Sequence, residues 1–170
     1  MAKVIWITGL SGSGKTTLAK LVTESLKKLG NPVLMLDGDI LRECFGIEGK
    51  NSREERLKIA FTYSRLCKMI SEQNINVVIA TIALFKEVHV WNKSHINDYF
   101  EVFLDVPIDE LKRRDPKGIY EKALKGKLKN VAGIDLTVDF PSNPNLHFQY
   151  HEDISPKEMK NQIISKLSEK

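Results

Sequence analysis

The sequence is poor in several features that would assign it to other classes of protein. It contains only two cysteines, Cys44 and Cys67, and they lack the spacing of a metal site, which favours unpaired thiols over a disulfide. No apolar stretch approaches the length of a membrane span, and no signal sequence precedes the first apolar segment. We therefore expect a cytoplasmic protein without a membrane partner.

Aromatic side chains are also scarce, at 8% of the residues. Proteins that bind nucleic acid often combine basic clusters with aromatic residues, whereas the basic residues of this chain are spread along it. The net charge of +4 and the isoelectric point of about 9.0 suit small anionic molecules rather than nucleic acid. At 170 residues the chain can bury one core but not two, so we expect a single domain over residues 1–170.

The most informative segment is residues 4–17, where an apolar run leads into the P-loop pattern G-x-x-x-x-G-K-S/T. Val4 to Thr8 predict a buried strand, and a helix follows. In this setting glycines turn backbone N–H groups toward phosphate oxygens, and the helix N-terminus adds a positive dipole. Lys15 is expected to act catalytically on the β- and γ-phosphates, and Thr16 to bind Mg²⁺. The residues of this loop predicted to bind ATP are Gly9, Ser11, Gly12, Ser13, Gly14, Lys15, Thr16 and Thr17.

Predicted strands and helices alternate along the rest of the chain. Apolar runs predict strands at 33–37, 77–80, 101–105 and 146–150, and helical spacing predicts helices at 53–73 and 86–95, after Pro107, and from Pro156 behind a Ser155 cap. This order favours a parallel sheet of about five strands with helices on both faces, the three-layer α/β/α fold of P-loop NTPases. Residues 115–145, rich in Pro, Gly, Lys and Asn, are expected to form a mobile excursion rather than a second domain. The helix behind the P-loop is indicated by the spacing of Leu18, Leu21, Val22, Ser25 and Leu29.

Two carboxylates follow the second predicted strand, in the run Leu36-Asp37-Gly38-Asp39. Because the carboxyl ends of parallel strands meet at one edge of a sheet, these side chains should face the transferring phosphate. Asp39 is predicted to orient or deprotonate an acceptor hydroxyl, and Asp37 to join the Mg²⁺ shell. Arg42, one turn further on, is predicted to hold a phosphate of the acceptor. An ordinary turn with a helix cap is the alternative explanation of the two aspartates.

Two classes of P-loop protein compete for this pattern: a kinase of small molecules, and a GTPase-like switch or motor ATPase. A switch reads guanine with Asn-Lys-x-Asp, but the nearest run, Asn92 to His95, lacks the aspartate and falls in a helical stretch. A D-x-x-G motif after a strand is missing as well. The sequence therefore favours a phosphotransferase that uses ATP as donor, Mg²⁺ as cofactor and a small-molecule nucleotide as substrate.

Several motifs, in order along nearly the whole chain, resemble the adenylylsulfate (APS) kinase family. They are the P-loop, the Asp37–Arg42 segment, Arg56 in the long helix, Glu101 to Pro107, the block Arg114-Asp115-Pro116-Lys117-Gly118-Ile119-Tyr120, and Ile134-Asp135. The resemblance implies transfer of the ATP γ-phosphate to the 3′-hydroxyl of a modified nucleotide, and it implies that residues 115–145 form a lid over both nucleotides. It also implies that Arg114 lies near ATP and that the acceptor is bound by Asp39, Arg42, Asn51, Arg56, Lys117, Lys129, Val131 and Ile134.

The departures from the family's pattern concern the acceptor. The family typically holds the acceptor's adenine between two phenylalanines, where this chain has Asn51 and Val131, and it has a polar asparagine where this chain has Ile59. Loss of the two phenylalanine rings removes on the order of 1–3 kcal/mol of stacking free energy per ring face. A branch of the family phosphorylates cytidine 5′-diphosphoramidate in capsule biosynthesis, and this chain resembles that branch. We expect a cytidine nucleotide as acceptor, with ordinary APS kinase as the alternative; the chain could also form a homodimer.

Overall fold

A parallel sheet forms the centre of the molecule. The computed structural model describes residues 2–47, 52–150 and 154–169. Its strands are β1 (Val4–Thr8), β2 (Val33–Asp37), β3 (Asn76–Ala80), β4 (Tyr99–Asp105) and β5 (Leu146–Gln149), arranged in the order β2-β3-β1-β4-β5. Every neighbouring pair in this order is parallel. The predicted five-stranded parallel sheet is therefore confirmed.

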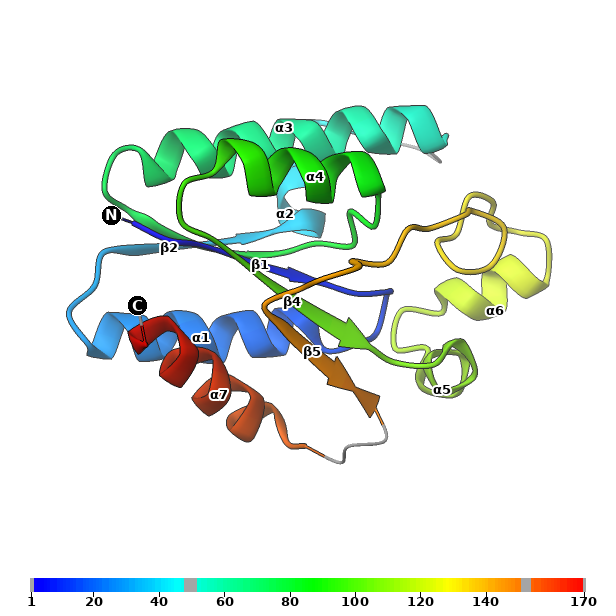
Figure 1. Ribbon diagram of the computed structural model, residues 1–170. Coiled ribbons are helices and arrows are strands. Elements are labelled where there is room, and N and C mark those ends of the chain that lie inside the picture. The colour runs from blue at the N-terminus through cyan, green and yellow to red at the C-terminus, as the bar shows by residue number, and fades with distance from the viewer. Residues whose placement is uncertain (1, 48–51, 151–153, 170) are drawn as a thin grey trace.

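Helices cover both faces of the sheet. In Figure 1, α1 (Lys15–Lys28) and α7 (Pro156–Ser168) lie below the sheet, and α3 (Arg53–Ser71) and α4 (Lys86–His95) lie above it. The short helix α2 (Gly38–Cys44) follows β2 directly. This is the three-layer α/β/α arrangement expected from the sequence.

Capping boxes fix where two of the helices begin. At the start of α3, the Ser52 side chain accepts from the Glu55 N–H, and the Glu55 side chain accepts from the Ser52 N–H. Ser155 and Glu158 form the same reciprocal pair at the start of α7, with proline in the first turn. Each box satisfies two backbone N–H groups that the helix itself cannot pair. The predicted Ser155 cap is thus confirmed.

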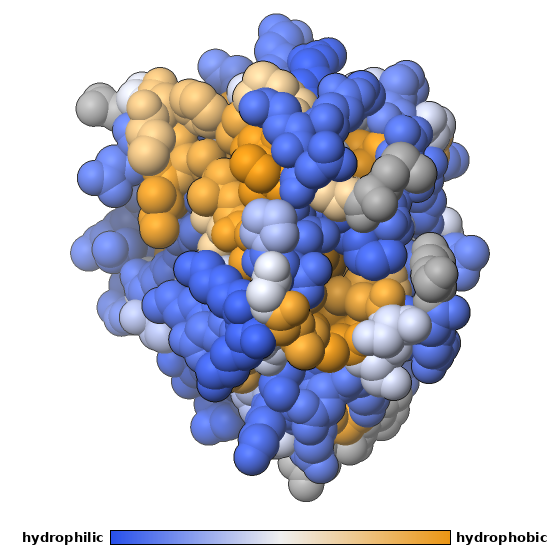
Figure 2. Space-filling view, turned by 90° about the vertical axis from the view of Figure 1, so that its left-hand side faces the viewer, coloured by the Kyte–Doolittle hydropathy of each residue, from blue (hydrophilic) through white to orange (hydrophobic). Residues whose placement is uncertain are grey.

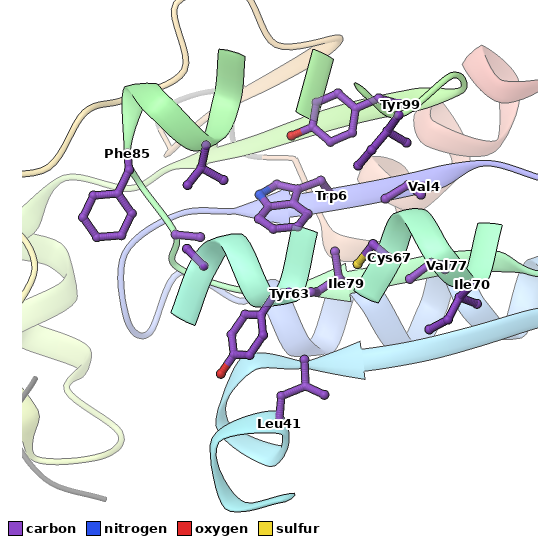
Figure 3. Packing of buried hydrophobic residues seen from close by; sticks show 14 residues of the cluster. Val4, Trp6, Leu41, Tyr63, Cys67, Ile70, Val77, Ile79, Phe85 and Tyr99 are labelled. Atoms are coloured by element: carbon purple, nitrogen blue, oxygen red, sulfur yellow. The ribbon is translucent and has the colours of Figure 1, made fainter. Parts of the chain in front are cut away.

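The core is divided by the sheet into an upper and a lower cluster. The upper cluster contains Trp6, Tyr63 and Tyr99, together with the buried faces of α3 and α4 (Figure 3). The lower cluster packs α1 and α7 against β1, β3 and β4. The buried face of α1 differs from the expected stripe, because Leu29 lies at the helix C-cap and is 64% exposed. Its buried residues are Leu18, Ala19, Val22, Thr23 and Leu26.

The lid segment contains α5 (Ile108–Arg114) at its entrance and α6 (Ile119–Leu124) within it. Figure 1 shows both at the end of the molecule near the carboxyl ends of the strands. Tyr120, Val131 and Leu136 of the lid are buried in a third cluster that includes Leu10 of the P-loop, and the mobility of the lid stays a prediction. The Tyr120 hydroxyl also donates to the carbonyl of Ser11 at 2.8 Å. We call these buried residues, from Leu10 to Leu136, the lid cluster.

The surface carries few features that bear on function. Within the described residues, no helix is long and apolar enough to cross a membrane. Both cysteines are free, with Cys44 exposed and Cys67 buried. Figure 2, which views the end of the molecule opposite the lid, shows apolar side chains gathered on part of an otherwise hydrophilic face. Leu34 of the edge strand β2 and Met69 of α3 are among the exposed large apolar side chains. The homodimer considered from the sequence stays a prediction.

Candidate active site

A cavity of about 580 Å³ opens where the P-loop, the turn after β2, helix α3 and the lid converge. This is the edge of the sheet at which the parallel strands end, as expected for an open α/β fold. The cavity brings together residues that lie as far apart in the sequence as Ser11 and Val138. The predicted site residues that line it are Ser11, Gly12, Gly14, Lys15, Thr16, Thr17, Asp37, Asp39, Arg42, Arg56, Lys117, Lys129 and Val131.

Some predicted residues lie elsewhere in the described part of the chain. The Arg114 Nε donates to Glu110 at 2.6 Å, and its guanidinium lies 5.0 Å from the centroid of the Tyr150 ring, outside the cavity lining. Ile134 packs against the lid cluster rather than into the cavity. Asn51 lies outside the described residues. Gly9 and Ser13 do not line the cavity either.

The P-loop backbone is shaped to receive an anion. Gly14 adopts a left-handed φ of 95° and forms the N-cap of α1. In the described P-loop and first turn of α1, no side chain caps the helix and no acidic residue is present, so the first N–H groups are available to a ligand. At Gly9 a Cβ would lie 2.6 Å from the Leu104 carbonyl oxygen, so only glycine lets the loop leave β1 beside β4.

The Lys15 amino group is held by the loop itself. Its Nζ donates to the carbonyl oxygen of Leu10 at 2.7 Å and lies 3.5 Å from the Ser13 Oγ. Burial lowers the pKa of Lys15 to about 8, and repulsion from Lys117 adds to this shift, while Asp39 and Asp37 oppose it. A phosphate that approached this amino group would restore its charge, because an opposite charge favours the protonated form.

Asp37 joins the P-loop to the turn after β2. One carboxylate oxygen accepts from the Thr16 hydroxyl at 2.7 Å, and the other accepts from the Asp39 N–H at 2.9 Å. The second bond makes Asp37 the N-cap of α2. The sequence offered a helix cap and a Mg²⁺ ligand as alternative explanations. The cap is present, and the bond to Thr16 places the same buried carboxylate beside the predicted hydroxyl ligand.

The turn between the two aspartates is held from three sides. The exposed carboxylate of Asp39 pairs with Lys117 of the lid. The Tyr63 hydroxyl of α3 donates to the carbonyl of Gly38 at 3.2 Å. On the other side, a Cβ at Gly38 would lie 3.1 Å from the Thr81 Oγ1, so the turn lies close against the end of β3.

A second basic region lies at the α3 side of the cavity. The Arg56 Nη2 donates to the carbonyl of Asn130 in the lid at 2.8 Å. Burial lowers the pKa of Arg56, and the nearby Arg42 guanidinium lowers it further, while Asp135 opposes the shift. Asp135 in turn accepts from the N–H groups of Asn130 and Val131, which fix the lid beside Arg56. Arg42 and Arg56 therefore place two positive charges near each other at this side of the cavity.

The wall beside these arginines is mainly apolar. Ile59 and Val131 both line the cavity, as do Leu84 and Phe85 from the segment after β3. Phe85 is only 4% exposed and is covered by the Arg53 guanidinium at 5.2 Å from the ring centroid. Sequence reasoning missed Tyr63, Thr81 and Phe85 as cavity residues. The helical spacing of Tyr63 indicated only that it packs on the sheet, and no motif marked the other two.

A phosphate-binding loop, an acidic turn and a basic lid around one cavity define a phosphotransferase of the P-loop class. Comparison with known proteins places it more closely. A family model described as Adenylylsulphate kinase matches residues 1–149, and the chain belongs to this family. It is accordingly an ATP-dependent kinase that phosphorylates a nucleotide 3′-hydroxyl.

The similar proteins include kinases of both candidate acceptors. The chain is 37% identical over 138 residues to the cytidine diphosphoramidate kinase of Campylobacter jejuni, with 81% of each chain covered. It is also 37% identical over 145 residues to an adenylyl-sulfate kinase of Pseudomonas aeruginosa, covering 84% of this chain and 74% of the relative. Among solved structures, the Mycobacterium tuberculosis APS kinase in complex with AMPPNP and APS is similar with a TM-score of 0.91 and 33% identity, covering 98% of each chain.

Proposed function

We propose that this kinase phosphorylates cytidine 5′-diphosphoramidate on its ribose 3′-hydroxyl, in the route to phosphoramidate-modified capsular polysaccharide. The observation that supports this acceptor is the apolar wall of the cavity, where Ile59 and Val131 stand at the positions of the family's asparagine and lid phenylalanine. An adenine base needs broad aromatic faces, whereas a pyrimidine presents a smaller ring to be covered. The relative from Campylobacter jejuni is consistent with this proposal.

The charges around the cavity fit the rest of this acceptor. Arg42 and Arg56 lie on the α3 side, and both line the cavity. Their guanidinium groups are suited to the 5′-diphosphate part of a nucleotide, which carries its charge close to the ribose. The terminal phosphoramidate carries an NH2 group, a hydrogen-bond donor, in place of one oxygen of the APS sulfate, so it does not need the same polar contact that is lost at Ile59.

The reaction follows from the placement of the carboxylates and the lysines. The P-loop N–H groups and Lys15 hold the β- and γ-phosphates of ATP. Asp39 accepts the proton of the acceptor 3′-hydroxyl as its oxygen attacks the γ-phosphorus, and the bond between that phosphorus and the β,γ-bridging oxygen breaks. The products are ADP and a 3′-phosphomonoester. Lys117, which pairs with Asp39 here, is placed to exchange this carboxylate for a phosphate oxygen.

The residues at the P-loop also fit a magnesium ion. Thr16 and Asp37 offer a hydroxyl and a carboxylate oxygen that lie 2.7 Å apart, and hard oxygen donors are the ligands that Mg²⁺ prefers. Within the described residues no group of three or more acidic, histidine or cysteine side chains could by itself hold a metal ion. When bound, Mg²⁺ neutralises charge that develops on the phosphates.

A nucleotide panel tests the acceptor. Initial rates of ADP formation are measured with cytidine diphosphoramidate, APS, CDP and CMP at saturating ATP. We expect kcat/KM for cytidine diphosphoramidate to exceed that for APS by at least about 10²-fold, because unpaired polar groups reject the wrong base strongly. Phosphorus NMR of the product should show a new monoester on the ribose with intact 5′-linked phosphates.

Two outcomes would contradict the proposal in different ways. Equal or better turnover of APS would make the chain an ordinary adenylylsulfate kinase. A nucleoside triphosphate product from CDP would mean transfer to a terminal phosphate rather than to the ribose. The KM for ATP serves as the internal control, since the donor site is the same for every acceptor.

A further inference from the structure

Tyr63 occupies a position at the border between the core and the cavity. Tyr63 is 3% exposed, belongs to the upper core cluster and also lines the cavity. Figure 3 shows its hydroxyl directed away from Trp6 and the centre of the cluster. The Phe45 ring at the end of α2 stacks on the Tyr63 ring, with centroids 6.4 Å apart and an interplanar angle of 23°. The ring is thus fixed by packing while its hydroxyl is free to make a specific bond.

That bond holds the backbone of the acidic turn. The hydroxyl donates to the carbonyl of Gly38 at 3.2 Å, and Gly38 is the residue between the two aspartates. The opposite side of Gly38 faces Thr81, whose Oγ1 would lie only 3.1 Å from an added Cβ. The turn is therefore clamped between α3 and the end of β3. A shift of the Gly38 peptide would move the backbone of both carboxylates.

The two aspartates differ in how much they depend on this clamp. Asp37 is buried and makes two further bonds, to Thr16 and to the Asp39 N–H. The Asp39 side chain is exposed and pairs with Lys117, whose own side chain is 53% exposed. The direction of the Asp39 carboxylate is thus set mainly by the backbone of the turn. We propose that Tyr63 is a positioning residue for phosphoryl transfer, which fixes the Gly38 carbonyl so that Asp39 points at the acceptor hydroxyl.

The hydroxyl remains a hydrogen-bond donor under all ordinary assay conditions. Burial raises the pKa of Tyr63 to about 12, and the charges of Asp39 and Asp37 act in the same direction, while Arg42 opposes them. The bond to Gly38 is therefore present across the pH range in which the enzyme can be studied.

This inference rests on the role proposed for Asp39, so the test separates the two. Steady-state rates are measured for the wild type, Tyr63→Phe, Asp39→Asn and the double variant, with the panel nucleotide that the wild type uses best. Tyr63→Phe keeps the ring and its packing. We expect kcat to fall about twofold to tenfold, the range that one lost hydrogen bond covers, with the KM for ATP unchanged. In the Asp39→Asn background the same substitution should have no further effect, because residues that act through one group are not additive.

Tyr99→Phe is the matched control. Its hydroxyl also makes buried bonds, donating to Glu101 at 2.9 Å and accepting from Asn92, but Tyr99 does not line the large cavity. The Tyr99→Phe variant should have a lower melting temperature than the wild type and an unchanged kcat. Gly38→Ala disturbs the same turn from the Thr81 side and should reproduce the loss of kcat.

The outcomes distinguish the two proposals. An unchanged kcat in Tyr63→Phe, with Asp39→Asn inactive, overturns the positioning role alone. Full activity of Asp39→Asn overturns the role of Asp39 itself and, with it, this inference. A loss of kcat in Tyr99→Phe equal to that in Tyr63→Phe would mean that general destabilisation explains both.

Discussion

Alkaline pH should weaken the use of ATP through Lys15. The charged amino group is the form that binds phosphate, and burial beside Lys117 lowers its pKa to about 8. The folded protein holds the Lys15 proton less tightly than a free lysine, whose pKa is 10.5. The charged, active form of Lys15 is therefore lost from about pH 8 upward. Without this shift the loss would begin only above about pH 10.

The size of the effect follows from a single titration. The ratio kcat/KM for ATP reports the enzyme form that ATP binds, here the complex with the acceptor. The ratio should be about half its plateau value at pH 8 and about tenfold below the plateau at pH 9. The kcat at saturating ATP should bend at higher pH, because the bound phosphates favour the charged amine. The assay is initial ADP release at fixed saturating acceptor, from about pH 6.5 to 9.5.

Lys117→Met isolates one cause of the shift. It removes a repelling charge and also releases Asp39, and both changes raise the pKa of Lys15. The alkaline limb of kcat/KM for ATP should move to higher pH, although the plateau falls. Lys129→Met is the matched control, since Lys129 lines the cavity but is not among the groups that shift Lys15. A profile that stays flat through about pH 9.5 in the wild type, or a limb that Lys117→Met leaves in place, would refute the reasoning.

Three further predictions concern the same cavity. Lys15→Ala should lower kcat by at least about 10²-fold, as for other preorganised electrostatic contacts, and near-normal turnover would exclude Lys15 from the mechanism. EDTA should abolish activity and Mg²⁺ restore it, and Asp37→Asn should raise the Mg²⁺ concentration needed for half-maximal rate; an unchanged requirement would remove Asp37 from the metal shell. Asn51→Phe with Val131→Phe should shift the ratio of kcat/KM from the cytidine nucleotide toward APS, measured with the same nucleotide panel, and an unmoved ratio would show that these positions do not read the base.

Much of the fold could be predicted because its determinants are local. The strand from Val4 to Thr8 is buried along its whole length, so a continuous apolar run was a reliable sign of it. The start of α7 could be predicted from Ser155 and Pro156, because capping interactions act within one helical turn. The prediction that Leu29 belongs to the apolar stripe of the first helix was wrong. Helical spacing alone does not say where a helix ends, and Leu29 lies one residue beyond α1.

The site could be predicted only in part, because motifs record residue types rather than partners. The P-loop spacing was sufficient to bring Lys15 and Thr16 to the cavity. Arg114 belongs to a motif that is more specific than the P-loop, but its side chain contacts Glu110 and Tyr150. The bond from Tyr63 to Gly38 joins positions 25 residues apart through the packing of α3 on the sheet. No local pattern in the sequence encodes such a contact.

The lid cluster joins the P-loop to the lid. Leu10 of the P-loop is packed with Tyr120, Val131 and Leu136 of the lid, and an added Cβ at Gly133 would lie only 3.0 Å from a Leu10 methyl group. The P-loop and the lid therefore share one set of contacts, and neither can shift without repacking the other. Whatever factor ATP contributes to the affinity for the acceptor, the acceptor must contribute to the affinity for ATP, because linkage between two binding equilibria is reciprocal.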